Sequence, residues 1–247
     1  MNVSVILPTF REKENIAGMI RALDALHLNG LEIIVADDHS PDGTAEAAME
    51  AAAKTVSTPV RVEQNPGPKG LSPSVVHGFA KASGDILVCM DADGQHRPED
   101  LPGLLAEFER DPAPALVVGS RHVPGGGFTE KWNLFRVMCS DGAAFAARLI
   151  LGVPLNDPMS GFFAVRRDAY ERVAPHLSPT GFKIMLELAF LFTLTKRDAI
   201  AEHPITFAMR KHGESKLSGR VMAQYLAMLW RCFRARPSLR RKLAAAS

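Results

Sequence analysis

Apolar runs and stretches of helical periodicity alternate along the first half of the chain. Five short apolar runs, bounded by polar or turn-forming residues, predict buried strands at residues 3–7, 31–36, 59–63, 85–91 and 115–119. Apolar positions at helical spacing between these runs predict helices at residues 11–26, 42–53, 73–82 and 98–110. We expect Pro8 to stop the first strand. The alternation predicts an α/β fold with a single doubly wound, mostly parallel sheet and flanking helices.

The second half of the chain is less regular. Its apolar pattern predicts a helix at residues 132–151, a strand at 160–165, a buried helix at 182–195 and a final strand at 200–209. Residues 216–233 carry apolar side chains near helical spacing, which predicts a C-terminal amphipathic helix.

Charge separates a C-terminal segment from the rest of the chain. Residues 216–247 carry eight basic side chains and no acidic one, whereas residues 1–215 carry 21 basic and 27 acidic side chains. A basic amphipathic segment suits contact with an anionic membrane surface. We therefore divide the chain into a globular body, residues 1–215, and a membrane-contacting segment, residues 216–247. The alternative is a helix packed on the body with a solvated basic tail.

The composition is that of an ordinary globular protein, with 47% hydrophobic and 23% charged residues. The three cysteines lack metal-type spacing, which favours a reducing cytosolic compartment. We find no signal peptide, and the longest apolar-rich stretch, residues 184–195, contains Glu187 and is too short to span a membrane. We therefore expect a protein without its own membrane span, held peripherally on the cytoplasmic face of a membrane, with no nucleic-acid partner.

Two carboxylates follow the apolar run that ends at Met90. Asp91 and Asp93 are two residues apart, and the carboxamide of Gln95 comes two residues later. Ligands of open α/β sheets bind beyond the carboxyl ends of the strands, where these groups would lie. Hard oxygen ligands of this kind hold Mg²⁺ or Mn²⁺, especially when substrate phosphates complete the coordination. The alternative is a polar turn, for which Asp-x-Asp-Gly is a common composition.

Further candidate side chains follow the first two predicted strands. Pro8, Phe10 and Glu12 follow the first strand, and Asp37 and Asp38 follow the second. A carboxylate after the second strand binds the nucleoside in many nucleotide-binding sheets, and we assign that contact to Asp38 and a structural role to Asp37. The chain has neither a G-x-G-x-x-G fingerprint after the first strand nor a P-loop, which excludes a Rossmann dehydrogenase and a P-loop NTPase.

Six motifs in order resemble a known family. Three of them resemble family 2 glycosyltransferases of the GT-A type: residues 3–15, 36–44 and 91–95. Three more narrow the resemblance to dolichol- or polyprenyl-phosphate mannosyltransferases: residues 119–121, 157–162 and 212–217. The resemblance covers residues 3–230, and it departs at Phe10, where the family often has Tyr, and at Ala36, where Val is common. We also expect the chain to lack the C-terminal membrane spans that some relatives carry.

The resemblance implies a GT-A glycosyltransferase fold, with residues 1–215 as the catalytic domain, and an inverting transfer of mannose from GDP-mannose to a polyprenyl phosphate. It implies a site for Mg²⁺ or Mn²⁺ at Asp91, Asp93 and Gln95, where the ion would act as a Lewis acid on the leaving diphosphate. The donor-binding residues that it implies are Pro8, Phe10, Glu12, Ala36, Asp38, Asp91, Ala92, Asp93, Arg121, Arg210 and Lys216. The sequence does not determine whether the protein needs a membrane-spanning protein partner.

We assign catalytic roles to Asp157 and Arg136, in addition to Asp91 and Asp93. Asp157 is the candidate general base if one is needed, because a phosphate nucleophile is already anionic near neutral pH. Its alternative role is to orient the turn before Ser160. Arg136 would bind the acceptor phosphate, and its alternative is a solvated charge on a helix face.

Several neighbouring residues carry weaker expectations. Lys183 either reaches the donor or caps a helix, and Trp132 and Phe135 either line a lipid groove or pack in the core. The histidines form no metal pattern, and three of them are expected to lie beside the site only by sequence: His39, His96 and His122.

Three other functions compete with mannosyl transfer. One keeps the fold and changes the donor, giving a UDP-glucose-dependent polyprenyl-phosphate glucosyltransferase. A sugar-nucleotide pyrophosphorylase is disfavoured because the chain has no Gly-rich basic signature near its N-terminus. A non-catalytic membrane-recruitment module would not require the acidic and basic residues of the motifs.

Overall fold

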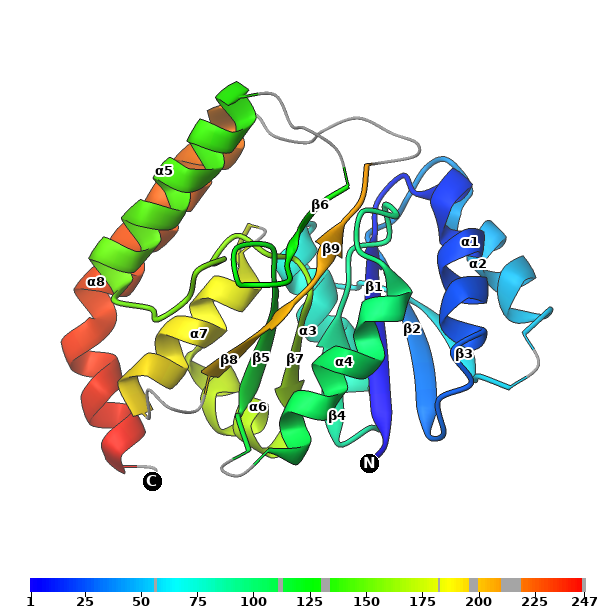
Figure 1. The fold of residues 1–247 in the computed structure, drawn as a ribbon, viewed down its shortest axis with the longest axis horizontal. Coiled ribbons are helices and arrows are strands. Elements are labelled where there is room, and N and C mark those ends of the chain that lie inside the picture. Colours follow the sequence, from blue (N-terminus) through cyan, green and yellow to red (C-terminus); the bar gives the residue numbers. More distant parts are fainter. Residues whose placement is uncertain are drawn as a thin grey trace.

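The computed structural model describes residues 1–55, 57–110, 113–129, 134–181, 183–195, 200–209 and 219–245, without the side chains of residues 134–140, 220 and 245. Within these residues, seven strands form a central sheet in the order β3-β2-β1-β4-β7-β5-β8 (Figure 1). These strands are β1 (Val3–Thr9), β2 (Leu31–Asp37), β3 (Val60–Gln64), β4 (Ile86–Cys89), β5 (Leu116–Ser120), β7 (Phe163–Arg166) and β8 (Ile200–Pro204). A short second sheet pairs β6 (Gly127–Phe128) with β9 (Thr206–Phe207).

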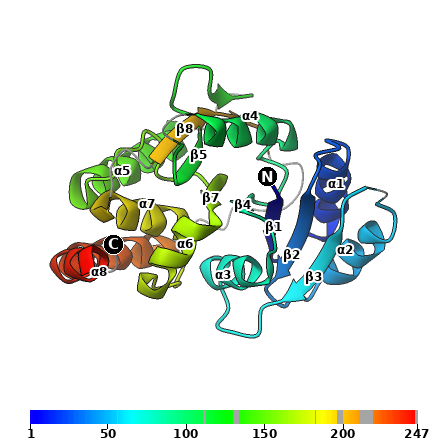
Figure 2. The same ribbon diagram turned by 90° about the horizontal axis from the view of Figure 1, so that it is seen from below.

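Helices lie on both faces of the central sheet (Figure 2). They are α1 (Lys13–Asp24), α2 (Thr44–Ala52), α3 (Leu71–Lys81), α4 (Leu101–Ala106), α5 (Leu134–Leu151), α6 (Arg167–Val173), α7 (Ile184–Thr195) and α8 (Gly219–Ala245). Short 3₁₀ helices are η1 (Pro98–Asp100), η2 (Glu107–Glu109) and η3 (Ala174–His176). Alternate strand residues supply two cores: Val5 and Leu7 of β1 pack with α1, and Ile6 packs with α3. The doubly wound α/β fold is confirmed.

The sheet is mostly parallel, as expected, with one exception. β7 runs antiparallel to both of its neighbours, β4 and β5. The remaining pairs in this sheet, from β3 to β4 and between β5 and β8, are parallel. An apolar run predicts a strand but carries no information about its direction, so the sequence pattern does not distinguish β7 from the parallel strands.

The first strand continues through Pro8, so the expectation that Pro8 stops it is wrong. Pro8 lies in register with Ala36, and the carbonyl of Thr9 accepts the N–H of Asp38 at 2.9 Å. The backbone of Thr9 thus faces β2, and that of Pro8 faces β4, whose pairing with β1 ends at Ile6. The missing N–H of Pro8 therefore costs no ladder hydrogen bond.

Two other expected elements divide into shorter ones. The predicted helix at residues 98–110 becomes η1, α4 and η2, because Pro98 and Pro102 are each tolerated only in the first turn of a helical segment. The predicted strand at residues 200–209 divides at Ile205 into β8 and β9. The strand predicted at residues 160–165 starts at Phe163, and α6, which follows it, was not predicted.

The C-terminal helix α8 packs on the body. Tyr225, Met228, Leu229 and Cys232 are buried in the core that α8 shares with α5 and α7. Among the helices that the structure describes, none has the length and apolar character needed to cross a membrane. α8 is thus part of the folded body, and its contact with a membrane remains a prediction.

Candidate active site

A cavity of about 430 Å³ opens at the carboxyl ends of β1 and β2. Its walls come from the end of β1, the loop between β3 and α3, and the first turns of α3 and α8. The lining residues are Pro8, Thr9, Phe10, Asp38, Lys69, Gly70, Leu71, Ser74, Gly181, Val221 and Gln224. Three predicted donor-binding residues, Pro8, Phe10 and Asp38, therefore meet in this cavity.

Asp37 and Asp38 have different surroundings. Asp37 is fully buried and accepts the hydroxyl groups of Thr9 at 2.9 Å and Ser40 at 2.6 Å, which makes it a structural acceptor. Asp38 faces the cavity, where its Oδ2 accepts the N–H of Gly70 at 2.9 Å. The loop after β3 thus holds the Asp38 carboxylate at the cavity wall.

Six of the predicted donor-binding residues that the structure describes do not line this cavity. Asp91, Asp93 and Arg121 belong to a neighbouring network, and the other three are Glu12, Ala36 and Ala92. Ala36 and Ala92 are buried in the two cores, so their side chains have almost no surface to offer a ligand. Glu12 is buried at the start of α1, where its N–H donates to the Thr44 hydroxyl at 3.0 Å and its Oε2 accepts the Asn15 amide at 2.9 Å. These contacts give Glu12 a place in the packing of α1 against α2.

Asp91 and Asp93 lie directly after β4. Asp91 is about one-third exposed, at 33%, whereas Asp93 is buried and accepts the N–H of Gln95 at 3.0 Å. The side-chain carboxamide of Gln95 donates to the backbone carbonyl of Ala208 at 3.3 Å. The backbone N–H of Ala208 donates to the backbone carbonyl of Gln95 at 2.8 Å. Gln95 therefore joins the acidic loop to the segment that follows β9.

The donor set of this loop fits a hard divalent ion. In the described part of the chain, no group of three or more His, Cys, Asp or Glu side chains could hold a metal by itself. A pair of carboxylates without an all-protein cage is typical of Mg²⁺ sites that substrate phosphates and water complete. Asp91 and Asp93 therefore fit as protein ligands, and the assignment of Gln95 as a third ligand stays a prediction.

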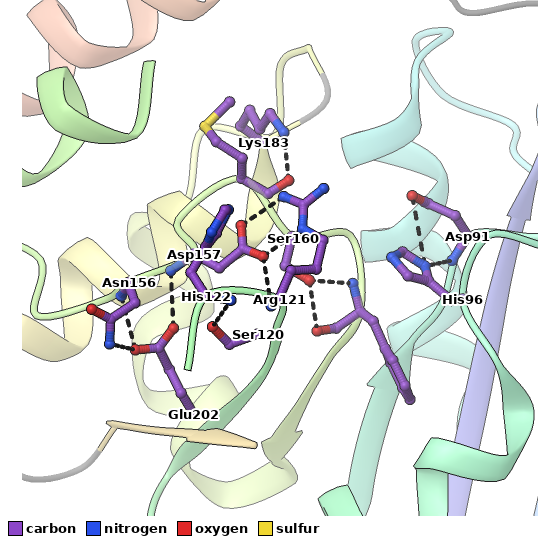
Figure 3. A network of polar contacts seen from close by, with 12 residues as sticks. Asp91, His96, Ser120, Arg121, His122, Asn156, Asp157, Ser160, Lys183 and Glu202 are labelled. Atoms are coloured by element: carbon purple, nitrogen blue, oxygen red, sulfur yellow. Dashed lines mark hydrogen bonds and ion pairs between the residues drawn. The ribbon is translucent and has the colours of Figure 1, made fainter. Parts of the chain in front are cut away.

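His96 contacts Asp91, so the expectation that His96 is near the site only by sequence is wrong (Figure 3). Its Nδ1 accepts the N–H of Asp91 at 3.3 Å, and its ring packs against Phe162 and Phe207. Burial lowers the pKa of His96 to about 4, although Asp93 opposes this effect. The ring is therefore neutral near pH 7 and positions the acidic loop as a hydrogen-bond acceptor.

A buried ion pair lies across the site from Asp91 (Figure 3). Arg121 donates from Nε to Asp157 Oδ2 at 2.6 Å and from Nη2 to Oδ1 at 2.7 Å. The guanidinium also lies over the rings of Phe128 and Phe207, at 5.5 and 4.9 Å. Such a bidentate pair is among the stronger hydrogen-bonding arrangements in proteins.

Both oxygens of Asp157 are engaged by Arg121. Burial raises the pKa of the Asp157 carboxyl, but the hydrogen bonds and charge of Arg121 outweigh burial and hold that pKa below its ordinary value. Glu202 of β8 fixes the preceding backbone, because it accepts the N–H groups of Asn156 at 2.8 Å and Asp157 at 2.9 Å. Asp157 is thus built to orient Arg121.

Lys183 adds a second cation to this network. Its Nζ donates to the carbonyl of Met159 at 3.0 Å. Burial lowers the pKa of Lys183 to about 8, and the charges of Asp91 and Asp157 act against that shift. Arg121 and Lys183 together place positive charge close to the two acids of the β4 loop.

Three predicted site residues are not placed by the structure. Arg210 and Lys216 lie outside the described residues, and Arg136 lies in α5 at a position whose side chain is outside them. The sequence pattern does not indicate the roles of two further residues, His96 and Glu202. His96 follows the acidic motif directly, which is a signal for contact with it. Glu202 has no local signal, because its partners are 45 and 46 residues away.

The backbone of Gly161 packs against the Asp91 carboxylate. A Cβ at this position would overlap both the Asp91 Oδ2 and its Cγ, the latter at 2.8 Å. We expect Gly161→Ala to displace Asp91 and to lower the rate of the sugar transfer that the resemblance implies by about 100-fold, the cost of roughly 1 Å of misplacement at a reacting centre. Enzyme assays of the variant, with its melting temperature as a control for folding, test this. A Gly161→Ala enzyme with the wild-type rate would contradict the placement of Asp91.

Comparison with known proteins identifies the family. Residues 4–174 match the family described as Glycosyl transferase family 2. The chain is 42% identical over 234 residues to a dolichol-phosphate mannosyltransferase of Pyrococcus furiosus, covering 94% of this chain and 63% of the relative. It is 40% identical over 233 residues to the dolichol-phosphate mannosyltransferase of Saccharomyces cerevisiae, covering 92% and 85% of the two chains. It is 36% identical over 253 residues to an undecaprenyl-phosphate mannosyltransferase of Micrococcus luteus, covering 97% and 100%.

The solved structures agree on the fold. The glucosyl-3-phosphoglycerate synthase of Mycobacterium tuberculosis in complex with Mn²⁺, UDP-glucose and phosphoglyceric acid superimposes with a TM-score of 0.71. That match has 25% sequence identity and covers 94% of this chain and 79% of the other. The resemblance to dolichol- and polyprenyl-phosphate mannosyltransferases is confirmed in sequence, although the chain spans less than two thirds of the Pyrococcus relative. The chain therefore belongs to glycosyl transferase family 2, and its fold is the GT-A fold of that family's glycosyltransferases.

Proposed function

We propose that this protein transfers mannose from GDP-mannose to a polyprenyl phosphate, with inversion at the anomeric carbon. The observation that carries the proposal is the grouping of two acids, Asp91 and Asp93, with the cations Arg121 and Lys183 around His96. Both acids follow β4, which lies next to β1 in the sheet, and the cavity of about 430 Å³ opens at the carboxyl end of β1. The names of relatives at 36–42% identity supply the acceptor and the sugar.

The chemistry needs charge neutralisation more than proton transfer. An oxygen of the acceptor phosphate bonds to the anomeric carbon while the bond from that carbon to the donor diphosphate breaks, and GDP leaves with the electron pair. The nucleophile is already anionic and both Asp157 oxygens are engaged, so the proposal assigns no general base. Arg121, oriented by Asp157, and Lys183 attract phosphate oxygens. When bound at Asp91 and Asp93, Mg²⁺ or Mn²⁺ would supply Lewis-acid stabilisation of the leaving diphosphate.

The test is transfer of radiolabel from a nucleotide sugar into an organic-soluble product. Purified protein, polyprenyl phosphate and Mg²⁺ or Mn²⁺ are mixed with labelled GDP-mannose or labelled UDP-glucose in separate reactions. The proposal predicts metal-dependent transfer from GDP-mannose. Transfer from UDP-glucose alone would support glycosyl transfer to a polyprenyl phosphate but contradict mannose as the sugar and guanine as the base of the donor. That outcome would establish the glucosyltransferase alternative.

A lipid acceptor requires contact with a membrane, and we assign that contact to an exposed apolar face of α5 and α8. This lipid face consists of Phe145, Leu149, Leu226, Trp230 and Phe233, and α5 and α8 lie side by side at one edge of the molecule (Figures 1 and 2). Trp230 is 61% exposed, and the guanidinium of Arg234 lies 5.9 Å from its ring centroid. An apolar face edged by arginine suits peripheral binding to an anionic bilayer.

The location on the cytoplasmic face also belongs to the proposal. The described cysteines Cys89 and Cys232 are free thiols, which is typical of a reducing compartment. The proposal does not require a membrane-spanning protein partner.

The double substitution Trp230→Ser/Phe233→Ser is expected to lower binding to vesicles that contain anionic phospholipid by at least about tenfold, because it removes two large apolar side chains from the contact. Cosedimentation with vesicles measures this, and binding by the wild type should also weaken with salt. Met49→Ser, at an exposed apolar residue of α2, is the matched control. Equal binding by the double variant and the wild type would contradict the lipid face.

A further inference from the structure

The nucleoside cavity has a wall that the sequence motifs do not predict. Val221 and Gln224, three residues apart on α8, line the cavity together with Asp38 and Phe10. These α8 residues belong to the segment that charge and amphipathicity assign to membrane contact. The lipid-face residues Leu226, Trp230 and Phe233 line a different groove, with Leu149 and Ile150 of α5. One helix thus contributes to two separate surfaces.

The polar side chains of the cavity differ in whether their hydrogen-bonding groups have partners within the protein. The Thr9 hydroxyl donates to Asp37 at 2.9 Å, and the Ser74 hydroxyl donates to the Gly70 carbonyl at 3.0 Å. The side chains of Gln224 and Lys69 make no hydrogen bond to another residue that the structure describes, and both residues are exposed. A carboxamide both donates and accepts, which is what the edge of a nucleobase requires.

The start of α8 is held in place next to Gln224. The hydroxyl of Tyr225 donates to the Ala143 carbonyl of α5 at 2.5 Å, and burial raises the pKa of Tyr225 to about 12, so the phenol keeps its proton. One turn and a half later, Arg231 pairs with Glu187 of α7 at 3.2 Å. These contacts to α5 and α7 fix the position of α8 beside the cavity, so Gln224 is presented from a rigid element.

We propose that α8 is part of the donor site, with Gln224 hydrogen-bonding the nucleoside of the nucleotide sugar and Val221 packing against it. This inference rests on the proposed function, because it takes the cavity as the nucleoside site. It gives residues 216–247 a role in donor binding besides membrane contact. Donor affinity then depends on the same helix that carries the lipid face.

Calorimetric titration of the full-length protein with GDP, and separately with UDP, in the presence of Mg²⁺ tests the proposal. Gln224→Ala is expected to weaken binding of the preferred nucleotide by about threefold to tenfold, the effect of one lost hydrogen bond. Val221→Asp, which places a charge in the wall, should weaken binding further. Gln64→Ala is the matched control, because Gln64 is an exposed residue at the end of β3 and is not part of the cavity lining. Melting temperatures verify that each variant is folded.

The outcomes separate the two proposals. Wild-type affinity in both the Gln224→Ala and Val221→Asp variants would overturn the role of α8 and leave the proposed function intact. A wild-type protein that binds neither GDP nor UDP would contradict the proposed function, and this inference with it. Weaker binding in the two α8 variants, with Gln64→Ala unchanged, supports the inference.

Discussion

Asp91→Asn and Asp93→Asn, which each remove the charge of one acid after β4, are expected to reduce mannosyl transfer by about two to three orders of magnitude. This is the usual cost of losing an electrostatic contact to charge that develops in a transition state. Both substitutions keep the size of the side chain and remove the negative charge that would hold the divalent ion. Steady-state rates at saturating GDP-mannose, measured over a range of Mn²⁺ concentrations, provide the measurement.

Asp168→Asn is the control for the acidic pair. Asp168 is an exposed residue of α6, where it pairs with Arg172 at 3.2 Å. Its substitution by Asn is expected to leave the rate of transfer unchanged. Melting temperatures are needed in addition, because Asp93 is buried and accepts the N–H of Gln95. A folded Asp91→Asn enzyme that retains more than about a tenth of the wild-type rate would contradict the role of this acid in catalysis.

Breaking the Arg121–Asp157 pair from one side is expected to be the most destabilising single change in the site. Asp157 is 1% exposed, so Asp157→Asn leaves the Arg121 guanidinium buried without its counter-charge. Loss of one partner of a buried pair lowers the free energy of unfolding by about 3–5 kcal/mol. Urea denaturation of the variant and the wild type measures this, and Arg172→Met, which breaks an exposed pair, should cost less than about 1 kcal/mol.

The same pair gives the stability a defined pH dependence. Because Arg121 lowers the pKa of Asp157 in the folded state, the stabilisation is fully present above the ordinary carboxyl pKa and is lost as the pH falls through the lowered value. The difference in unfolding free energy between the wild type and Asp157→Asn should therefore be constant near neutral pH and shrink in acid. The double variant Arg121→Met/Asp157→Leu should recover stability but not transfer. Recovery of transfer in that variant would show that the pair serves folding alone.

The general architecture could be predicted from the sequence because a strand that is buried on both faces consists of a continuous run of apolar residues. That pattern does not contain the direction of β7, which depends on which neighbours it pairs with. Pro8 shows a related limit: whether proline ends a strand depends on which side of it has a hydrogen-bonding partner, and β4 has already ended there. The division of the predicted helix at residues 98–110 could have been predicted, because the sequence itself shows its two prolines, each of which is tolerated only in the first turn of a helical segment.

The site was predictable where its residues follow strand ends, as Asp38, Asp91 and Asp93 do. The orienting contacts were not, because they join distant parts of the chain: Arg121 to Asp157, and Glu202 to Asn156. Ala36 lies inside a motif and its side chain is buried in the core, so its assignment to the donor site stays a prediction. The place of α8 beside the cavity also depends on tertiary packing, through Tyr225 and α5, which no local pattern encodes.

The identity of the released nucleotide tests the central claim most directly. A single turnover of GDP-mannose with polyprenyl phosphate would be quenched, and its soluble products separated by ion-exchange chromatography. Cleavage at the anomeric carbon predicts GDP, in equal amount to a lipid that carries one mannose. Release of GMP would mean that mannose phosphate had been transferred and would contradict the mechanism, and GDP with free mannose would show hydrolysis of the donor instead of transfer to the lipid.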